Sequence, residues 1–312
     1  MPSLPTTKMA MKNNTPFSGI LLVDKPQGIT SHDVVFRVRK LFGTREVGHT
    51  GTLDPMATGL LVVLVGRAVK ASDMIVSDAK RYEAGLTLGI TTDTEDTTGT
   101  VLTTSDAIPS PDEVRTVAES FVGDILQVPP MYSALKVGGK KLVDLAREGK
   151  VIEREARPIT VFSLTVEEET DRRYTLDVHC SKGTYIRTLC ADIGATIGCG
   201  GAMHALRRVA SGSFTLDGAY TLEALEAMTL EERISCLRPV EEVFSDCPML
   251  RLPKFYENLS KNGCEIYQKK VGTHFAVGKR LRLYDDNGFY ALAEVRDYPD
   301  GSAIKAIKRF DV

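Results

Sequence analysis

The sequence has no long hydrophobic run. Its longest unbroken apolar stretch, Leu60 to Val65, is far shorter than the about 20 residues that a helix needs to cross a bilayer, so no membrane segment is expected. The first residues, Met1 to Pro16, lack both the apolar centre and the small-residue cleavage site of a secretory signal. We therefore expect residues 1–17 to form a disordered tail.

Metal-binding and redox patterns are also missing. The six cysteines are scattered and none forms a C-x-x-C pair, which argues against a zinc site or a thioredoxin-like motif and fits a reducing, cytoplasmic environment. The five histidines are dispersed, and neither H-E-x-x-H nor the phosphate-binding G-x-x-x-x-G-K-S/T pattern occurs. The sequence thus gives no support for metal catalysis.

A general positive charge is absent as well. The chain of 312 residues has a formal net charge of -2 and a pI of about 6.3, so any nucleic-acid binding must come from a local patch. Its 43% hydrophobic and 26% charged residues are ordinary for a globular protein with a real core. The length suggests one large domain and one smaller domain.

The spacing of apolar residues predicts both strands and helices in the first part of the chain. Ile20 to Val23 is typical of a short strand. The capping pair Thr30 and Asp33 then starts a helix that stops at Gly43.

One segment, Gln127 to Pro158, breaks the regular pattern with Pro-Pro and Gly-Gly pairs and a single short amphipathic piece. It carries seven basic side chains against four acidic ones, a local positive excess in a slightly acidic chain. Irregular segments this long inside a compact domain tend to be functional. Two interpretations remain open: a mobile basic element that closes over a nucleic acid, or a solvated connection.

The most informative stretch is Gly48-His49-Thr50-Gly51-Thr52-Leu53-Asp54-Pro55-Met56-Ala57-Thr58-Gly59-Leu60. Its three internal and flanking glycines allow the backbone to approach a ligand closely, and Pro55 fixes the chain just after a lone acid. Taken by itself, the stretch also fits a plain turn in which Asp54 bonds to its own backbone.

As a string, however, this stretch closely resembles the catalytic motif of the TruB family of tRNA pseudouridine synthases. Other segments resemble the same family in the same order, and together they cover about Gly19 to Val240. An ordered set of this kind is hard to obtain by chance. The segments are Leu22-Val23-Asp24-Lys25-Pro26 with Gly28, Thr30 and Ser31; Lys80-Arg81-Tyr82; Thr92-Asp93-Thr94 with Asp96 and Gly99; Gly183-Thr184-Tyr185-Ile186-Arg187; and Leu206-Arg207-Arg208.

The resemblance implies an α+β fold. We expect a catalytic domain at residues 18–247, built on a mixed, largely antiparallel sheet flanked by helices, with residues 127–158 as an RNA-binding thumb. Residues 248–312 are rich in short strands and turn signals, notably Asp286-Asn287-Gly288, which predicts a small all-β domain. This domain resembles, more loosely, the PUA-type RNA-binding module that follows the catalytic domain in the family.

The chemistry of the family fits these residue types. Formation of pseudouridine breaks a C–N glycosidic bond and makes a C–C bond without redox change, so it needs a nucleophile, a proton relay and a pocket, but no cofactor or metal. The resemblance makes Asp54 the nucleophile, which attacks either the base or the sugar. Arg187 would pair with Asp54 and keep it ionised; from the sequence alone, Arg187 could also be a surface charge on a helix.

The resemblance also supplies a substrate pocket. Tyr82 would stack on the uracil, with a weaker role in proton relay because the ordinary pKa of a tyrosine is near 10; packing in the core is the alternative. Tyr185 and Leu206 would line the pocket. His49 would contact the flipped-out nucleotide or help to hold the loop open. The target base must leave its stack, which costs least in an RNA loop.

Bacterial members of the family modify the T-loop uridine at tRNA position 55 without a guide RNA, so no guide, obligate protein partner or membrane is expected. Three alternatives are a guide-dependent rRNA enzyme, an RNA-binding folding helper and a hydrolase with an aspartate nucleophile. The long basic insert favours the stand-alone enzyme over the first. Intact Asp54, Tyr82 and Arg187 argue against the second, and the insert and the lack of metal ligands argue against the third.

We predict that replacing Lys136, Lys140 and Lys141 together by Ala flattens the plot of log RNA affinity against log salt by up to about two units. Each phosphate contact contributes a slope of about 0.7–0.9, and all three lysines lie in the basic insert. Thermal unfolding should be unchanged, because a loop with few contacts contributes little to folding. An unchanged salt slope would make the insert a solvated connection.

Overall fold

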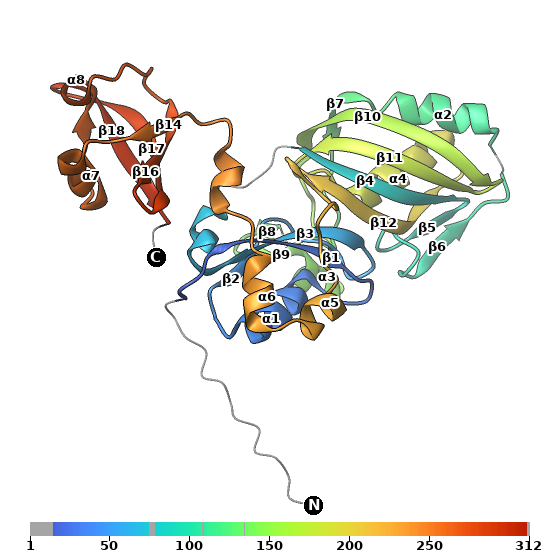
Figure 1. Ribbon diagram of the computed structural model, residues 1–312. Helices are drawn as coiled ribbons and strands as arrows, with labels where there is room; N and C mark the ends of the chain where they lie inside the picture. The colour runs from blue at the N-terminus through green and yellow to red at the C-terminus, as the bar shows by residue number, and fades with distance from the viewer. Residues whose placement is uncertain (1–14, 75–78, 108, 134, 311–312) are drawn as a thin grey trace, which may run out of the picture.

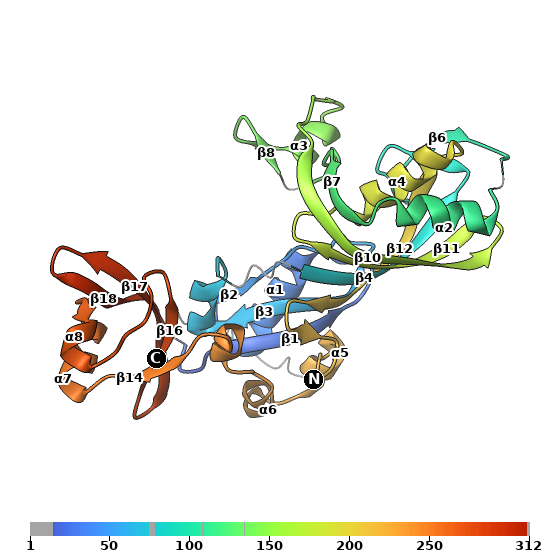
Figure 2. The ribbon, with the colours of Figure 1, turned by 90° about the horizontal axis from the view of Figure 1, so that it is seen from above.

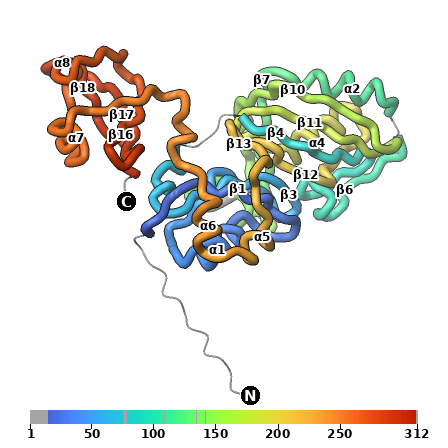
Figure 3. Tube along the Cα trace, in the orientation of Figure 1, coloured from blue at the N-terminus to red at the C-terminus, as the bar shows by residue number. Residues whose placement is uncertain are grey.

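The computed structural model describes residues 15–74, 79–107, 109–133 and 135–310 (Figure 1). Within these residues, the N-terminal and larger part of the chain is built on a large sheet. The C-terminal part is built on a smaller sheet with two helices. The trace in Figure 3 shows α7, α8 and β16–β18 gathered at the C-terminal end of the chain. No helix in the described part is long and apolar enough to cross a membrane.

The large sheet has nine strands in the described residues, in the order β1-β3-β12-β4-β11-β10-β7, with β2 beside β3 and β13 beside β12. Its strand pairs are antiparallel except for β3 and β12, which meet in parallel where Arg208 faces Gly59. The predicted mixed, largely antiparallel sheet is confirmed. The strands are β1 (Gly19–Lys25), β2 (Val47–His49), β3 (Thr58–Val65), β4 (Ala79–Leu88), β7 (Gly123–Gln127), β10 (Arg157–Thr170), β11 (Arg173–Ser181), β12 (Gly201–Ser211) and β13 (Phe214–Thr215).

Helices cover the sheet and connect its strands. α1 begins after the capping box of Thr30 and Asp33 and ends at Gly43, whose φ of 62° is left-handed. Both ends agree with the sequence prediction. The helical segments are α1 (Ser31–Phe42), η1 (Gly66–Ala71), α2 (Pro111–Glu119), α3 (Leu142–Arg147), α4 (Ile186–Ile197), α5 (Leu222–Ala227), α6 (Leu230–Ser235), η2 (Val240–Phe244), α7 (Lys254–Lys261) and α8 (Gln268–Val271).

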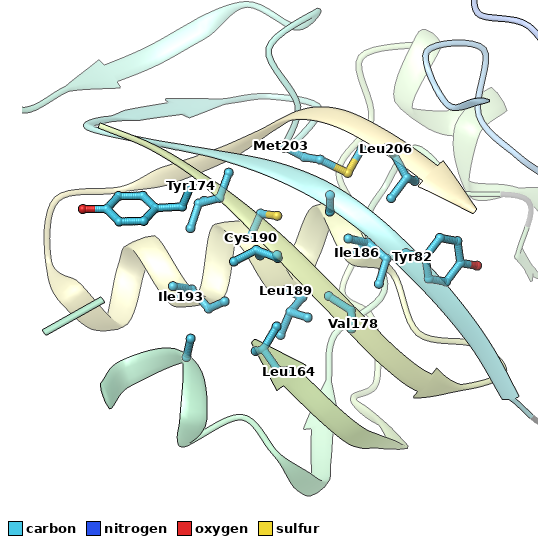
Figure 4. Close-up of a cluster of buried hydrophobic side chains, with 14 of the residues drawn as sticks. Tyr82, Leu164, Tyr174, Val178, Ile186, Leu189, Cys190, Ile193, Met203 and Leu206 are labelled. Atoms are coloured by element: carbon cyan, nitrogen blue, oxygen red, sulfur yellow. The ribbon is translucent and has the colours of Figure 1, made fainter. Parts of the chain in front are cut away.

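α4 and α2 pack on the part of the sheet formed by β4, β11 and β10 (Figure 4). Leu189 and Ile193 of α4 are fully buried there, in one cluster with Val178 of β11. Tyr82 and Leu206 belong to the same cluster and lie at one end of it. The two residues predicted to line a substrate pocket, Tyr82 and Leu206, therefore lie at the end of the core on which α4 packs.

The thumb leaves the sheet between two neighbouring strands. β7 and β10 pair side by side, and Gln127 faces Arg157 at the point where the excursion begins and ends. The segment between them contains α3 and the short pair β8 (Lys136–Val137) and β9 (Lys140–Lys141). Figure 2 shows β8 and α3 projecting away from the large sheet, beyond the ends of β7 and β10.

The core of the C-terminal part is made of β-strands, as predicted, with α7 and α8 beside them. This part packs against the large sheet. The ring centroids of Phe289 and Phe310 are 5.4 Å apart, and Phe244 lies 5.9 Å from Phe310. Phe310 belongs to one buried cluster with Leu60 and Val62 of β3. The strands are β14 (Met249–Arg251), β15 (Ile266–Tyr267), β16 (Arg280–Asp285), β17 (Gly288–Tyr298) and β18 (Gly301–Arg309); the separate hairpin of the catalytic part is β5 (Ile90–Thr92) with β6 (Val101–Thr104).

The expected N-terminal tail is shorter than predicted. Thr15 is buried, and its hydroxyl bonds to the Thr44 hydroxyl at 2.6 Å and donates to Glu46 at 2.8 Å. The rings of Phe17 and Phe42 are 5.8 Å apart. Residues 15–17 are thus fixed against the start of β2, contrary to the expectation of disorder up to residue 17. Residues 1–14 lie outside the described residues.

We predict that Gly59→Ala unfolds at a lower temperature than Gly198→Ala. Both glycines have a left-handed φ, 97° and 93°, so both variants carry the backbone strain. A Cβ at Gly59 would also lie 2.4 Å from Arg208 O, whereas one at Gly198 meets nothing within 4 Å. The clash adds about 1–3 kcal/mol of destabilisation. Equal melting temperatures in calorimetry would show that β3 can move away from β12.

Candidate active site

The loop that carries Asp54 runs from β2 to β3 and is held by the segment from the end of β1 to the first residue of α1. The buried hydroxyl of Ser31 accepts a hydrogen bond from Leu53 N at 2.8 Å and donates to Leu53 O at 3.1 Å. Gly28 N donates to Pro55 O at 2.7 Å. The residues on both sides of Asp54 are therefore fixed by a separate part of the chain.

Lys25, from the same segment, also donates hydrogen bonds to the loop. It is fully buried, and its Nζ donates to Ala57 O at 2.7 Å and to Pro26 O at 2.9 Å. Burial lowers the pKa of Lys25 to about 8, and the nearby negative charge of Asp54 opposes that shift. Lys25 is part of the motif resemblance, but the sequence did not indicate this role.

Arg208 holds the loop from the other side. Its side chain is almost fully buried, and its guanidinium donates to Leu60 O at 2.8 Å and to Gly51 O at 3.0 Å. Because β12 and β3 meet in parallel at this point, Arg208 reaches both ends of the loop. A buried charged group needs such partners, since leaving it unpaired costs several kcal/mol. This role of Arg208 was also missed from the sequence.

Asp54 forms an ion pair with Arg187. Arg187 Nε lies 3.0 Å from Asp54 Oδ2, and the side chain of Asp54 is 38% exposed while that of Arg187 is 6% exposed. The predicted pairing is therefore present, and it accompanies a backbone turn in which Asp54 O accepts a hydrogen bond from Ala57 N at 3.1 Å. The alternative of a surface charge for Arg187 is wrong, because α4 points this side chain inward.

The remaining donors of Arg187 reach two other segments. One terminal nitrogen donates to Thr94 O at 3.0 Å and the other to Tyr132 O at 2.9 Å. The buried carboxylate of Asp96 lies 3.8 Å away. A single guanidinium thus connects the loop that carries Asp54, the loop after β5 and the base of the thumb.

Tyr82 and Leu206 lie next to each other on neighbouring strands at the edge of the core (Figure 4). Tyr82 is 7% exposed and Leu206 is 9% exposed. Burial raises the pKa of Tyr82 above its ordinary value, so its hydroxyl keeps its proton at neutral pH. Core packing and a stacking surface are both compatible with this placement.

Tyr185 is the residue before α4, and His49 is the last residue of β2. Tyr185 is half-buried, and burial raises the pKa of its hydroxyl. His49 Nδ1 accepts a hydrogen bond from Gly51 N at 3.3 Å. Burial, followed by the positive charge of Arg208, lowers the pKa of His49, so the imidazole is neutral at pH 7.

The thumb lysines are not part of this cluster of contacts. Lys136 and Lys140 are exposed on the β8–β9 hairpin, and the side chain of Lys141 lies outside the described part of the structure. In the described residues, no group of three or more His, Cys, Asp or Glu side chains could hold a metal ion. What the site offers is a half-exposed carboxylate, a buried guanidinium and two neutral aromatic hydroxyls.

The fold is shared with solved structures of H/ACA RNA–protein complexes. The chain superposes on the structure titled "Crystal Structure of a Cbf5-Nop10-Gar1 Complex" with a TM-score of 0.70 at 23% identity, covering 96% of this chain and 92% of that one. A structure of an H/ACA RNP bound to a substrate RNA containing 2'-deoxyuridine also matches with a TM-score of 0.70. At this level of identity, the likeness shows the fold alone.

The chain belongs to the TruB family. The model of the TruB family pseudouridylate synthase N-terminal domain matches residues 39–186, and that of the tRNA pseudouridylate synthase B C-terminal domain matches residues 187–245. The tRNA pseudouridine synthase B of Alkaliphilus oremlandii is 44% identical over 282 residues, 90% of this chain and 94% of that one. That of Syntrophotalea carbinolica is 49% identical over 238 residues, 75% and 77% of the two chains. This chain is an isomerase that acts on tRNA.

We predict that Arg187→Met lowers the rate of pseudouridine formation by more than about 100-fold and the free energy of unfolding by about 1–3 kcal/mol. The second effect follows because two carbonyls lose their donor. Arg233→Met is the control, since Arg233 likewise donates to backbone carbonyls, in its case the three of Leu41, Leu225 and Glu226. It should lose stability but keep its rate. Equal rate losses in the two variants would make Arg187 a structural residue.

Proposed function

We propose that the enzyme converts the T-loop uridine of tRNA to pseudouridine, with Asp54 as the catalytic group and no cofactor. The observation that carries the proposal is the ion pair of half-exposed Asp54 with buried Arg187. The guanidinium fixes one oxygen of the carboxylate, with Arg187 Nε 3.0 Å from Asp54 Oδ2. Because the carboxylate is partly open to solvent, a ligand can approach it.

In the proposed reaction, the Asp54 carboxylate adds either to the uracil ring or to the ribose carbon that bears it. The N1–C1′ bond breaks, the base turns, and a C5–C1′ bond forms. The proton leaves C5, N1 gains a proton, and Asp54 is released as a carboxylate. The sum is an isomerisation, so it needs neither an oxidant nor a reductant.

Tyr82 would serve mainly as a surface on which the uracil stacks. Its raised pKa, caused by burial, makes its phenolate scarce at neutral pH and favours stacking over proton abstraction. Stacking of a base on an aromatic ring contributes about 1–3 kcal/mol to binding. Leu206, which adjoins Tyr82 in the same cluster, and Tyr185 would complete the apolar walls.

To reach Asp54, the target base must turn out of its stack, which costs least in a loop. His49 is placed at the start of the catalytic loop and is neutral because burial lowers its pKa. We infer that it contacts the nucleotide as it leaves the stack. The exposed lysines of the thumb, Lys136 and Lys140, would contact phosphates, and the C-terminal sheet would add a PUA-like RNA-binding surface.

We further propose that the enzyme acts alone in the cytoplasm. Its relatives named tRNA pseudouridine synthase B are 40–49% identical over most of the chain, while the H/ACA proteins share 22–23% identity with it. This difference favours the stand-alone enzyme over the guide-dependent one. The scattered free thiols fit a reducing compartment.

We predict that Asp54→Asn abolishes conversion of a T-loop transcript while its RNA affinity stays within a few-fold of wild type, because Asp54 reacts and does not bind. Asp177→Asn is the control: Asp177 pairs with Arg81 at 2.8 Å on the exposed part of β4 and β11, away from the site. It should turn over normally. Retention of even a tenth of the wild-type rate by Asp54→Asn would remove Asp54 as the nucleophile.

A further inference from the structure

We propose that Gln127 is a positioning residue for the reaction. It fixes the backbone of Tyr185 immediately before α4, and through it the placement of Arg187 beside Asp54. The inference rests on the proposed function of this site and adds the first residue of the predicted thumb, for which the sequence predicted no role of its own.

The contact is a matched pair of hydrogen bonds to one residue. Gln127 is the last residue of β7 and is 2% exposed. Its Nε2 donates to Tyr185 O at 3.1 Å, and its Oε1 accepts from Tyr185 N at 2.8 Å. Because both ends of the amide are used on a single backbone residue, the contact fixes the position and the direction of the chain at Tyr185.

The start of α4 depends on this contact. Tyr185 is the extended residue before the helix, and no side chain caps the helix there. Its carbonyl also accepts the first helical hydrogen bond, from Leu189 N at 3.0 Å. Arg187 is only two residues further, in the first turn. A shift of Tyr185 therefore moves the guanidinium that engages Asp54.

A second contact joins the same two segments in the opposite direction. Arg187 donates to Tyr132 O at 2.9 Å, and Tyr132 lies five residues beyond Gln127 at the entry to the thumb. The side chain of Gln127 thus reaches from the base of the thumb to the backbone before α4. The side chain of Arg187 reaches from α4 to the backbone at the base of the thumb. The position of the thumb base and the geometry at Asp54 are linked by these two contacts.

Gln127→Leu tests the proposal by removing both hydrogen bonds at nearly constant volume. A displacement of about 1 Å at a reacting centre can cost 100-fold in rate. We expect the single-turnover rate at saturating tRNA to fall by about 10- to 100-fold, with the RNA Kd within about threefold of wild type. If Gln127 acted only in RNA binding or only in folding, the rate would not fall while the RNA Kd stays near that of wild type.

Gln268→Leu is a matched control. Gln268 is 3% exposed in the C-terminal part, and it makes the same pair of bonds to Phe275, donating to Phe275 O at 3.0 Å and accepting from Phe275 N at 2.7 Å. Its loss should lower the melting temperature to a similar extent but leave the single-turnover rate at saturating tRNA unchanged. Equal rate losses in the two variants would overturn the proposal.

Gln127→Glu keeps the acceptor for Tyr185 N but loses the donor while it is ionised. Protonation restores a donor to Tyr185 O, so the rate of Gln127→Glu relative to wild type should rise as the pH falls. This series also carries the test if Gln127→Leu does not fold. A flat ratio, a Gln127→Leu rate within threefold of wild type, or a loss of affinity without a loss of rate would each overturn the proposal. A wild-type protein that converts no uridine would instead refute the proposed function.

Discussion

The buried guanidinium of Arg187 is the group on which the site depends. A charge removed from water is tolerated only if its donors find partners, and Arg187 finds them in Asp54, Thr94 and Tyr132. These three residues belong to three segments that are far apart in the sequence. Each segment must therefore be in place before the carboxylate has its counter-ion. The reactive geometry is a property of the assembled fold, and no single motif contains it.

The loop that carries Asp54 is likewise held by buried cations, in this case Lys25 and Arg208. Lys25 and Arg208 point into the protein and donate to loop carbonyls, so the backbone around Asp54 is held by strong donors on both sides. Such a loop loses little entropy when the substrate arrives, because its shape is already fixed. This rigidity requires the burial of two positive charges. The loop carbonyls that accept their hydrogen bonds offset part of the cost, and burial still lowers the pKa of Lys25 to about 8.

The sequence predicted the pairing of Asp54 with Arg187, but it did not predict the residues that hold the loop around Asp54. Asp54 and Arg187 were paired through the resemblance, and the capping box of Thr30 and Asp33 was read from local spacing, which depends only on neighbouring residues. Lys25 and Arg208 escaped prediction because lysine and arginine are almost always exposed, and no local pattern shows that their partners are distant carbonyls. Gln127 meets Tyr185 across 58 positions of sequence, and only the folded sheet brings them together. The packing of Thr15 likewise depends on a contact with Thr44 that the polar composition of the N-terminus does not suggest.

The buried cluster that joins Phe310 and Leu292 to Leu60 and Val62 ties the two sheets together thermodynamically. Separation of the C-terminal sheet alone would expose the part of this cluster that Leu292 and Phe310 cover, with the increase in heat capacity that accompanies hydration of apolar surface. We therefore expect the two sheets to unfold in one cooperative transition. A fragment without the C-terminal sheet would need other apolar side chains at the positions that Leu292 and Phe310 fill in this cluster.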